Sequence, residues 1–155
     1  MTTVTTAAAE ATAPAATPRG ATGAARSAGS TAPAPRGRVS FVGAGPGDPG
    51  LLTVRAVQLL RDADVVVTEV PEHDGMVREL LTDVAEDALP ELLDGGFGED
   101  GQPLTHAARG KVVVKAAKGG RRVVRLMSGD PFLYASGPEE AQACVKAGLG
   151  LEIVP

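Results

Sequence analysis

The chain has 155 residues, which is enough for one domain of ordinary size. From residue 38 onward it carries 12 basic and 18 acidic residues, and this acidic balance excludes the basic face that nucleic acid requires. No apolar run approaches the roughly 20 residues of a membrane span, and the single cysteine, Cys144, allows no internal disulfide. These features predict a cytoplasmic protein with no nucleic-acid or membrane partner.

The first 37 residues differ from the rest in composition. They contain 13 Ala, 8 Thr, 4 Pro and 4 Gly and no aromatic residue, so they bury too little apolar surface to offset the entropy lost on ordering. We therefore expect a disordered tail over residues 1–37 and a folded domain over residues 38–155. Because the tail is rich in Thr, carries three Arg residues and has one acidic residue, an organelle transit peptide is an alternative that stays open.

The domain is predicted to begin with a strand, a glycine turn and a helix. An apolar run at residues 39–42 is typical of a strand buried on both faces. It runs into three glycines at alternate positions, which are Gly43, Gly45 and Gly47. Leu and Ala recur at helical spacing over residues 53–62, and Thr53 stands where a helix would begin. The apolar run at residues 65–68 then predicts a second strand and completes a βαβ unit.

The rest of the domain is predicted to continue this alternation. A short helix is expected over residues 74–82. Residues 83–103 show no clear pattern, and within them residues 95–103 show loop signals. The later elements are a helix over residues 104–118, a strand over 122–126, a tight turn over 128–131, a helix over 138–147 and a strand over 151–154. Residues 112–114 could equally form a strand by propensity. The sequence therefore predicts an α/β fold of four strands in a parallel-rich sheet with flanking helices.

Both turns follow the carboxyl ends of predicted strands. Because parallel strands place these ends at one edge of the sheet, we expect residues 43–47 and 128–131 to face a shared ligand site. Two alternatives for the first turn are a tight turn without a ligand and a G-x-G-x-x-G dinucleotide site with Glu69 on the ribose. Against the dinucleotide site, the third glycine comes one residue early and Pro46 has no N–H for a pyrophosphate.

The two turns also carry a resemblance to a known family. Val-Gly-Ala-Gly-Pro-Gly-Asp-Pro-Gly-Leu-Leu-Thr at residues 42–53 and Gly-Arg-Arg-Val-Val-Arg-Leu-Met-Ser-Gly-Asp-Pro-Phe at residues 120–132 resemble tetrapyrrole methylases, above all uroporphyrinogen-III C-methyltransferases. The resemblance implies two α/β domains that hold S-adenosylmethionine between them and usually form a homodimer. It also implies methyl transfer to carbons of uroporphyrinogen III, on the route to sirohaem and cobalamin. The second domain is expected to be absent from these 155 residues.

The resemblance implies site residues position by position. It assigns cofactor binding to Pro46, Ser128, Gly129, Asp130 and Leu133. Glu69 matches the position of an Asp that is proposed as a proton acceptor in the family, and methylation of a pyrrole carbon requires loss of a proton. Asp130 as a turn residue before Pro131 and Glu69 as a solvated loop acid are the alternatives.

Departures from the family pattern suggest further hypotheses. Ser128 replaces a family glycine, and the family's Val-Gly-Lys-Arg stretch has no match. One hypothesis is that the chain is the methylase part of a bifunctional protein that also carries a uroporphyrinogen-III synthase. Another is a catalytically idle cofactor-binding or interaction module.

The remaining chemically active side chains carry weaker signals. Three basic residues could meet tetrapyrrole carboxylates or lie on a solvated face, and they are Arg121, Arg122 and Arg125. His73 and His106 are isolated from other ligand-type residues, so no metal site is predicted. Cys144 lies on an apolar helical face and is predicted to be a core residue.

Overall fold

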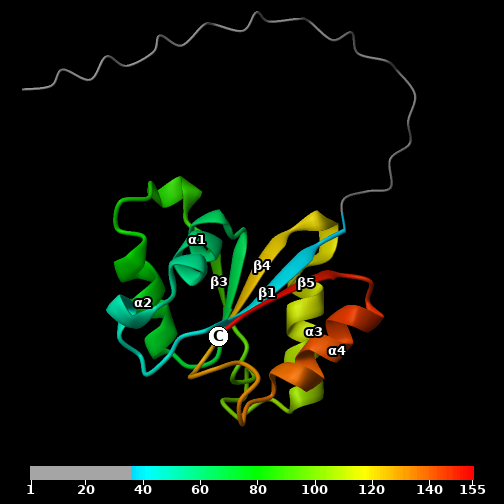
Figure 1. The fold of residues 1–155 in the computed structure, drawn as a ribbon. Coiled ribbons are helices and arrows are strands. Elements are labelled where there is room, and N and C mark those ends of the chain that lie inside the picture. The colour runs from blue at the N-terminus through cyan, green and yellow to red at the C-terminus, as the bar shows by residue number, and fades with distance from the viewer. Residues whose placement is uncertain (1–35) are drawn as a thin grey trace, which may run out of the picture. The chain divides into compact units, whose positions relative to one another are not determined.

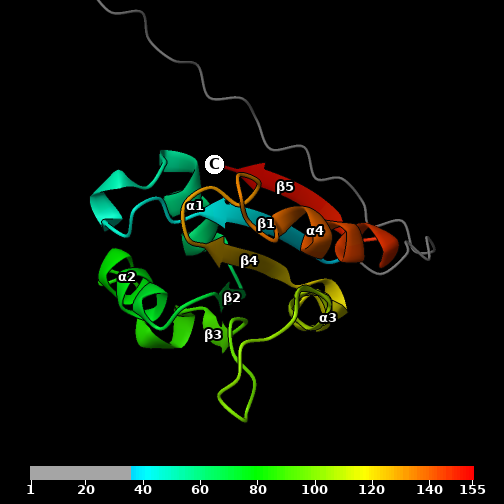
Figure 2. The ribbon, with the colours of Figure 1, turned by 90° about the horizontal axis from the view of Figure 1, so that it is seen from below.

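The computed structural model describes residues 36–155, so the predicted disordered tail lies outside it except for Arg36 and Gly37. Five strands form one sheet in the order β3-β2-β4-β1-β5, and every pair is parallel (Figures 1 and 2). They are β1 (Arg38–Gly43), β2 (Val65–Thr68), β3 (Glu91–Asp94), β4 (Arg122–Met127) and β5 (Gly150–Val154). The predicted α/β fold with a parallel sheet is confirmed.

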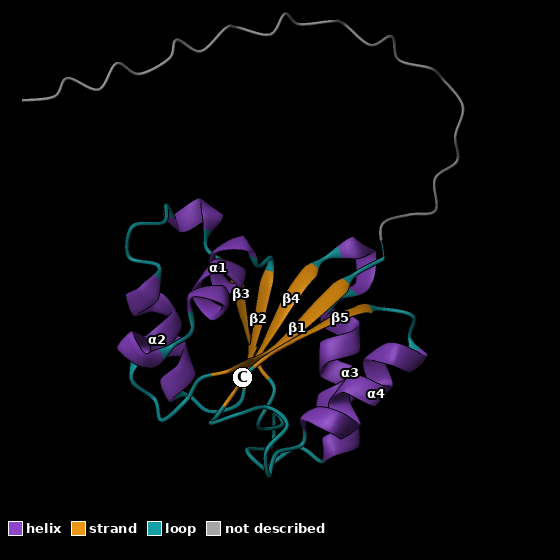
Figure 3. Ribbon diagram, in the orientation of Figure 1, coloured by secondary structure: helices purple, strands orange, loops and turns teal. Residues whose placement is uncertain are grey.

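Helices cover both faces of the sheet (Figure 3). α1 (Val54–Asp62) and α2 (Glu72–Leu80) pack on one face, and α3 (His106–Ala116) and α4 (Gly137–Lys146) pack on the other. Three short 3-10 helices, η1 (Pro49–Leu51), η2 (Glu86–Ala88) and η3 (Lys118–Gly120), lie in the connections. Within residues 36–155 no helix combines the length and the apolar character needed to cross a membrane.

β2 is buried along its whole length because helices cover it on both faces. Neighbouring residues of a strand point to opposite faces, so Val65 and Val67 pack with α3 and α4, whereas Val66 packs with α1 and α2. Threonine caps set the starts of two helices. Thr53 Oγ1 accepts the Ala56 N–H at 3.1 Å, and Thr105 Oγ1 accepts the Ala108 N–H at the start of α3. Residues 112–114 lie inside α3, so the predicted helix is confirmed and the alternative of a strand there is wrong.

The sequence predicts four strands, and the structure adds a fifth, β3, in the segment 83–103 that shows no clear pattern, directly before the predicted loop at residues 95–103. β3 lies at one edge of the sheet and pairs with β2 alone. Its ends are the exposed acids Glu91 and Asp94, and its two leucines are half-buried. A short edge strand with charged ends and no β-branched residue does not produce the apolar run that identifies central strands.

Candidate cofactor site

The two glycine turns lie side by side at the carboxyl edge of the sheet. The Gly45 N–H donates to the Gly129 carbonyl at 3.2 Å, and the Gly129 N–H donates to the Gly45 carbonyl at 3.0 Å. Behind them the Ala44 N–H donates to the Met127 carbonyl at 2.7 Å. The prediction that both turns open at the same edge is therefore confirmed.

Glycine is required in these turns for two separate reasons. Gly45 and Gly129 have φ angles of 59° and 66°, in the left-handed region that glycine adopts without steric cost. Gly43 meets a close approach instead, because a Cβ at this position would lie 2.5 Å from the Gly129 carbonyl oxygen. The close contact between the turns thus depends on a missing side chain at the end of β1.

A cavity of about 300 Å³ opens beside the turns. Its lining comes from the two turns and from the segment between β2 and α2, and consists of Gly45, Pro46, Gly47, Val70, Glu72, His73, Met76 and Ser128. The volume is at the lower end of the range for small-molecule pockets. The structure therefore brings two of the predicted residues, Pro46 and Ser128, to one cavity, and Gly129 follows directly in the chain.

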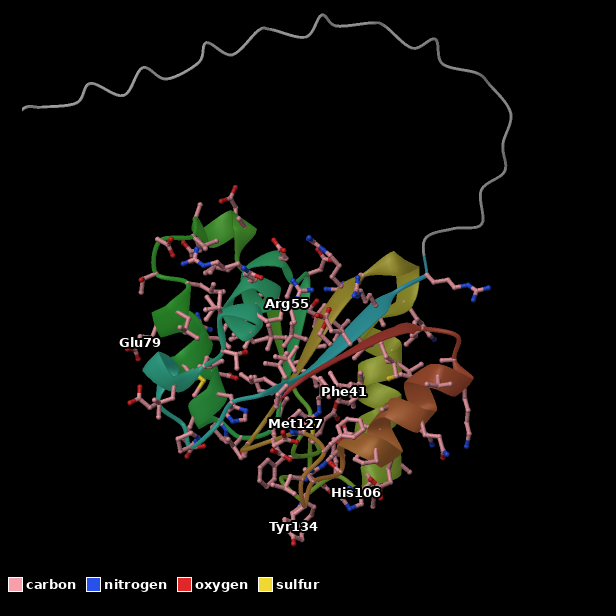
Figure 4. All side chains as sticks on the ribbon, viewed as in Figure 1. Phe41, Arg55, Glu79, His106, Met127 and Tyr134 are labelled. Atoms are coloured by element: carbon pink, nitrogen blue, oxygen red, sulfur yellow. The ribbon has the colours of Figure 1, made fainter. Side chains whose placement is uncertain are left out.

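The other two predicted cofactor residues lie in the loop after Ser128. Asp130 Oδ1 accepts the Phe132 N–H at 2.7 Å and the Leu133 N–H at 3.0 Å, as its alternative role in a turn predicts. Leu133 is 66% exposed, and the next residue, Tyr134, is fully exposed with a positive φ of 55°. Figure 4 shows Tyr134 pointing away from the body of the domain. This loop presents apolar side chains to its surroundings at the same edge as the cavity.

Glu69 lies at the end of β2 and is not the solvated acid that one alternative describes. Its Oε1 accepts a hydrogen bond from Arg109 Nη1 at 3.2 Å, and its Oε2 accepts the Ser128 N–H at 2.8 Å. These contacts place the carboxylate directly behind the Ser128 turn. The catalytic role expected for Glu69 stays a prediction, because no contact with a reacting group tests it.

His73 belongs to the site although it looks isolated in the sequence. Its side chain is buried in the cavity wall, with Nε2 3.5 Å from Ser128 Oγ and Nδ1 3.4 Å from the Glu69 N–H. Burial lowers the pKa of the imidazole. The signal in the sequence is its position four residues after Glu69, in the first turn of a helix. Residues 36–155 contain no group of three or more His, Cys, Asp or Glu residues that could hold a metal ion.

The three arginines of β4 and its approach do not form a carboxylate-binding patch. Arg121 and Arg122 pair with Glu91 and Asp64 at the amino edge of the sheet, opposite the cavity. Arg125 is fully buried, so for this residue both alternatives, contact with tetrapyrrole carboxylates and a solvated face, are wrong. It lies in a central strand, and α4 supplies Glu140 as a buried partner, with 2.8 Å between Arg125 Nε and Glu140 Oε2.

The core position of Cys144 is confirmed. The side chain is fully buried in the cluster between the sheet, α3 and α4. Burial raises the pKa of the thiol to about 11. The residue is therefore a small apolar core group and not a thiolate nucleophile.

Together the fold and the turns define a parallel α/β domain with a small cavity at the carboxyl edge of its sheet. The sequence profile of the Tetrapyrrole (Corrin/Porphyrin) Methylases matches residues 38–155, and the chain belongs to that family.

Curated relatives include siroheme synthases from several bacteria. Siroheme synthase 1 of Pectobacterium atrosepticum is 42% identical over 123 residues, which are 79% of this chain and 24% of the relative. The siroheme synthase of Gluconobacter oxydans is 42% identical over 120 residues, covering 77% and 24%. The chain thus spans about a quarter of the length of these relatives.

Solved structures of similar fold include uroporphyrin-III-C-methyltransferase of Thermus thermophilus. One such structure has a TM-score of 0.61 at 35% identity, over 77% of this chain and 47% of the other. A structure of the Thermus thermophilus enzyme complexed with S-adenyl homocysteine has a TM-score of 0.58 at 32% identity, over 77% and 48%. The chain covers about half of these enzymes.

Proposed function

We propose that this chain supplies the first half of an S-adenosylmethionine-dependent C-methyltransferase that acts on a tetrapyrrole, with uroporphyrinogen III as the substrate. The observation that carries the proposal is the pair of hydrogen-bonded glycine turns beside a cavity of about 300 Å³. Similarity to an enzyme solved with S-adenyl homocysteine supports the choice of cofactor. The siroheme synthases among the relatives support a place on the route to sirohaem.

The chain's own residues suit this cofactor chemically. Gly45 and Gly129 carry no side chain, so a ligand can approach the backbone at these two positions closely. Asp130 uses only Oδ1 within its loop, and among the described residues Oδ2 has no hydrogen-bond partner. A carboxylate oxygen in this position can accept from a ligand hydroxyl or ammonium group and complements a cationic sulfonium.

Once the cofactor is bound, the protein would contribute to methyl transfer mainly by positioning it. When bound, S-adenosylmethionine supplies the methyl group that a pyrrole carbon attacks. Pro46 and Leu133 would limit the orientations that the cofactor can adopt, and a fixed orientation lowers the barrier to such a transfer. The remaining walls of the site would come from the part of the family fold that this chain does not cover.

Titration of the chain with S-adenosylhomocysteine, followed by amide NMR and calorimetry, tests the proposal. We expect the Gly45, Gly47 and Gly129 amide signals to shift, whereas Gly119 and Gly148, at the opposite edge of the sheet, should stay in place. Absence of both heat and shifts from the folded wild-type chain would contradict the proposal and favour an idle module. Binding of NADH in place of S-adenosylhomocysteine would favour the dinucleotide site.

Matched variants make this test specific to the cavity. Ser128→Leu should abolish binding because it fills the cavity, and Thr82→Leu, at an exposed position outside it, should not. Asp130→Ala should weaken binding, and the control Asp87→Ala, on the exposed η2, should leave it unchanged. Equal effects of a variant and its control would show that the cavity is not the site.

Other features of the proposal rest on the sequence and on the family resemblance. They are the homodimer, the cytoplasmic location and the lack of nucleic-acid or membrane partners. Light scattering on purified protein tests the homodimer. The bifunctional alternative is tested by reading the coding sequence beyond Pro155, because absence of a uroporphyrinogen-III synthase sequence there would remove it.

A further inference from the structure

We propose that Glu69, paired with Arg109, is a positioning residue that fixes the Ser128 turn against the Gly45 turn. This role deepens the proposed function and rests on it for the identity of the ligand. It also gives Glu69 a task other than that of a proton acceptor.

The backbone around Glu69 is held from several directions. The carbonyl of the preceding residue, Thr68, accepts hydrogen bonds from the Gly95 N–H at 2.8 Å and from Arg125 Nη1 at 2.9 Å. Gly96 packs so closely that a Cβ there would lie 2.0 Å from the Glu69 carbonyl oxygen. Because Arg125 is itself fully buried, the end of β2 has little room to move.

Both carboxylate oxygens of Glu69 accept hydrogen bonds from fixed donors. One donor is Arg109 Nη1 and the other is the Ser128 N–H, at 3.2 and 2.8 Å. Arg109 Nε donates in turn to the Leu104 carbonyl at 3.1 Å, so its guanidinium is anchored at two points. The Glu69 and Arg109 side chains are only 19% and 17% exposed, and water therefore competes weakly for these hydrogen bonds.

These contacts join segments that are far apart in the sequence. Glu69 follows β2, Arg109 lies in α3, and Ser128 follows β4. The next residue, Gly129, exchanges two hydrogen bonds with Gly45, so the position of the Ser128 N–H sets the spacing between two walls of the cavity. Each oxygen of the Glu69 carboxylate thus accepts one hydrogen bond from a fixed donor, and these two contacts support the wall of the cavity.

Hydrogen exchange of backbone amides, measured by NMR on the 155-residue chain, tests this role. Glu69→Ala removes both contacts, and we expect exchange of the Ser128 amide to accelerate roughly tenfold or more, the ratio expected for a hydrogen bond to a charged group. The matched control is Asp83→Ala, which breaks the two-point pair between Arg61 and Asp83 outside the cavity lining. It should leave exchange at Ser128 unchanged.

Two more variants separate positioning from general stabilisation. Arg109→Met keeps the Glu69 carboxylate on Ser128 and should accelerate exchange less than Glu69→Ala. The double variant Glu69→Arg with Arg109→Glu restores an ion pair but offers no acceptor to Ser128. It should therefore regain thermal stability while exchange at Ser128 stays fast.

Unchanged exchange and unchanged chemical shifts at Ser128, Gly129 and Gly45 in folded Glu69→Ala would overturn the positioning role. If Glu69→Ala fails to fold, normal Ser128 protection in the folded double variant would overturn it equally. If exchange accelerates in Glu69→Ala but the wild-type chain does not bind S-adenosylhomocysteine, the proposed function would be overturned and the positioning role supported. Binding that survives Glu69→Ala at wild-type affinity would support the function and overturn the role.

Discussion

The two edges of the sheet use the same pair of chemical groups in opposite ways. At the amino edge, Arg122 binds Asp64 at 2.7 Å with side chains that are 59% and 38% exposed. Toward the carboxyl edge, Arg125 and Glu140 form a pair that is fully buried. An exposed ion pair competes with water and contributes little to stability, whereas a buried pair is costly to break. The arginine–carboxylate pair at the amino edge thus lies on the surface, whereas the pair toward the carboxyl edge fixes the geometry of the interior.

Breaking the buried pair should have the largest effect. Glu140→Ala leaves the Arg125 charge buried without its carboxylate partner, and we expect a loss of about 3–5 kcal/mol in the free energy of unfolding measured with urea. Glu139→Ala, at the exposed neighbouring position in the same first turn of α4, is the control. Similar losses in both variants would show that the buried pair with Arg125 is not what makes Glu140 important.

The second prediction concerns the spacing of the turns at the carboxyl edge. Gly43→Ala would place a Cβ 2.5 Å from the Gly129 carbonyl oxygen, and we expect a cost of about 1–3 kcal/mol in urea unfolding. Gly75→Ala in α2 meets nothing within 4 Å, so it should instead stabilise the protein slightly, because alanine favours a helix. A stabilising Gly43→Ala would mean that the turns can separate freely.

The third prediction uses pH. Burial lowers the pKa of His73 in the folded protein, so on acidification the unfolded chain takes up its proton first, near the ordinary imidazole value of about 6.5. The folded state is therefore fully stable with respect to this group above that pH, and its free energy of unfolding decreases as the pH falls toward the pKa of His73 in the folded protein. His73→Gln should flatten the decline in urea midpoint, and the exposed His106→Gln should not. Parallel pH profiles for wild type and His73→Gln would contradict the burial of a neutral imidazole.

The smallest effect is expected at the amino edge. Hydrogen bonds from the side chain and the N–H of Arg122 lower the pKa of the Asp64 carboxyl. Its contribution is thus present above the ordinary carboxyl pKa and is lost as the pH falls. Because the pair is exposed, Asp64→Asn should cost less than about 1 kcal/mol in urea unfolding, and added salt should reduce the difference. A loss as large as that of Glu140→Ala would remove the contrast between the edges.

The sequence predicts what depends on local pattern. Strands that helices cover on both faces can be recognised as apolar runs, such as residues 65–68, and the Thr53 cap marks the start of α1. The common edge of the two turns follows from parallel topology alone. In contrast, β3 lacks an apolar run, and the pairing of Arg125 with Glu140 joins residues whose proximity only the packing of α4 on the sheet creates.

The same distinction applies to the site. Glycines at positions 45 and 129 can be recognised in the sequence because their backbone geometry restricts the residue type. The partners of Glu69 cannot, since Arg109 and Ser128 lie 40 and 59 positions away along the chain. A carboxylate at the end of a strand has the same local pattern whether it faces water, a substrate or a guanidinium group.

The place of β4 between β1 and β2 has a consequence for biosynthesis. The first two strands to leave the ribosome are not neighbours in the sheet, and each waits for a segment that ends only at residue 127. Until then their backbone groups have no partner from β4, and such late, long-range pairing slows folding and prolongs exposure to aggregation. We therefore expect nascent chains released before β4 to bind chaperones far more than those released after it.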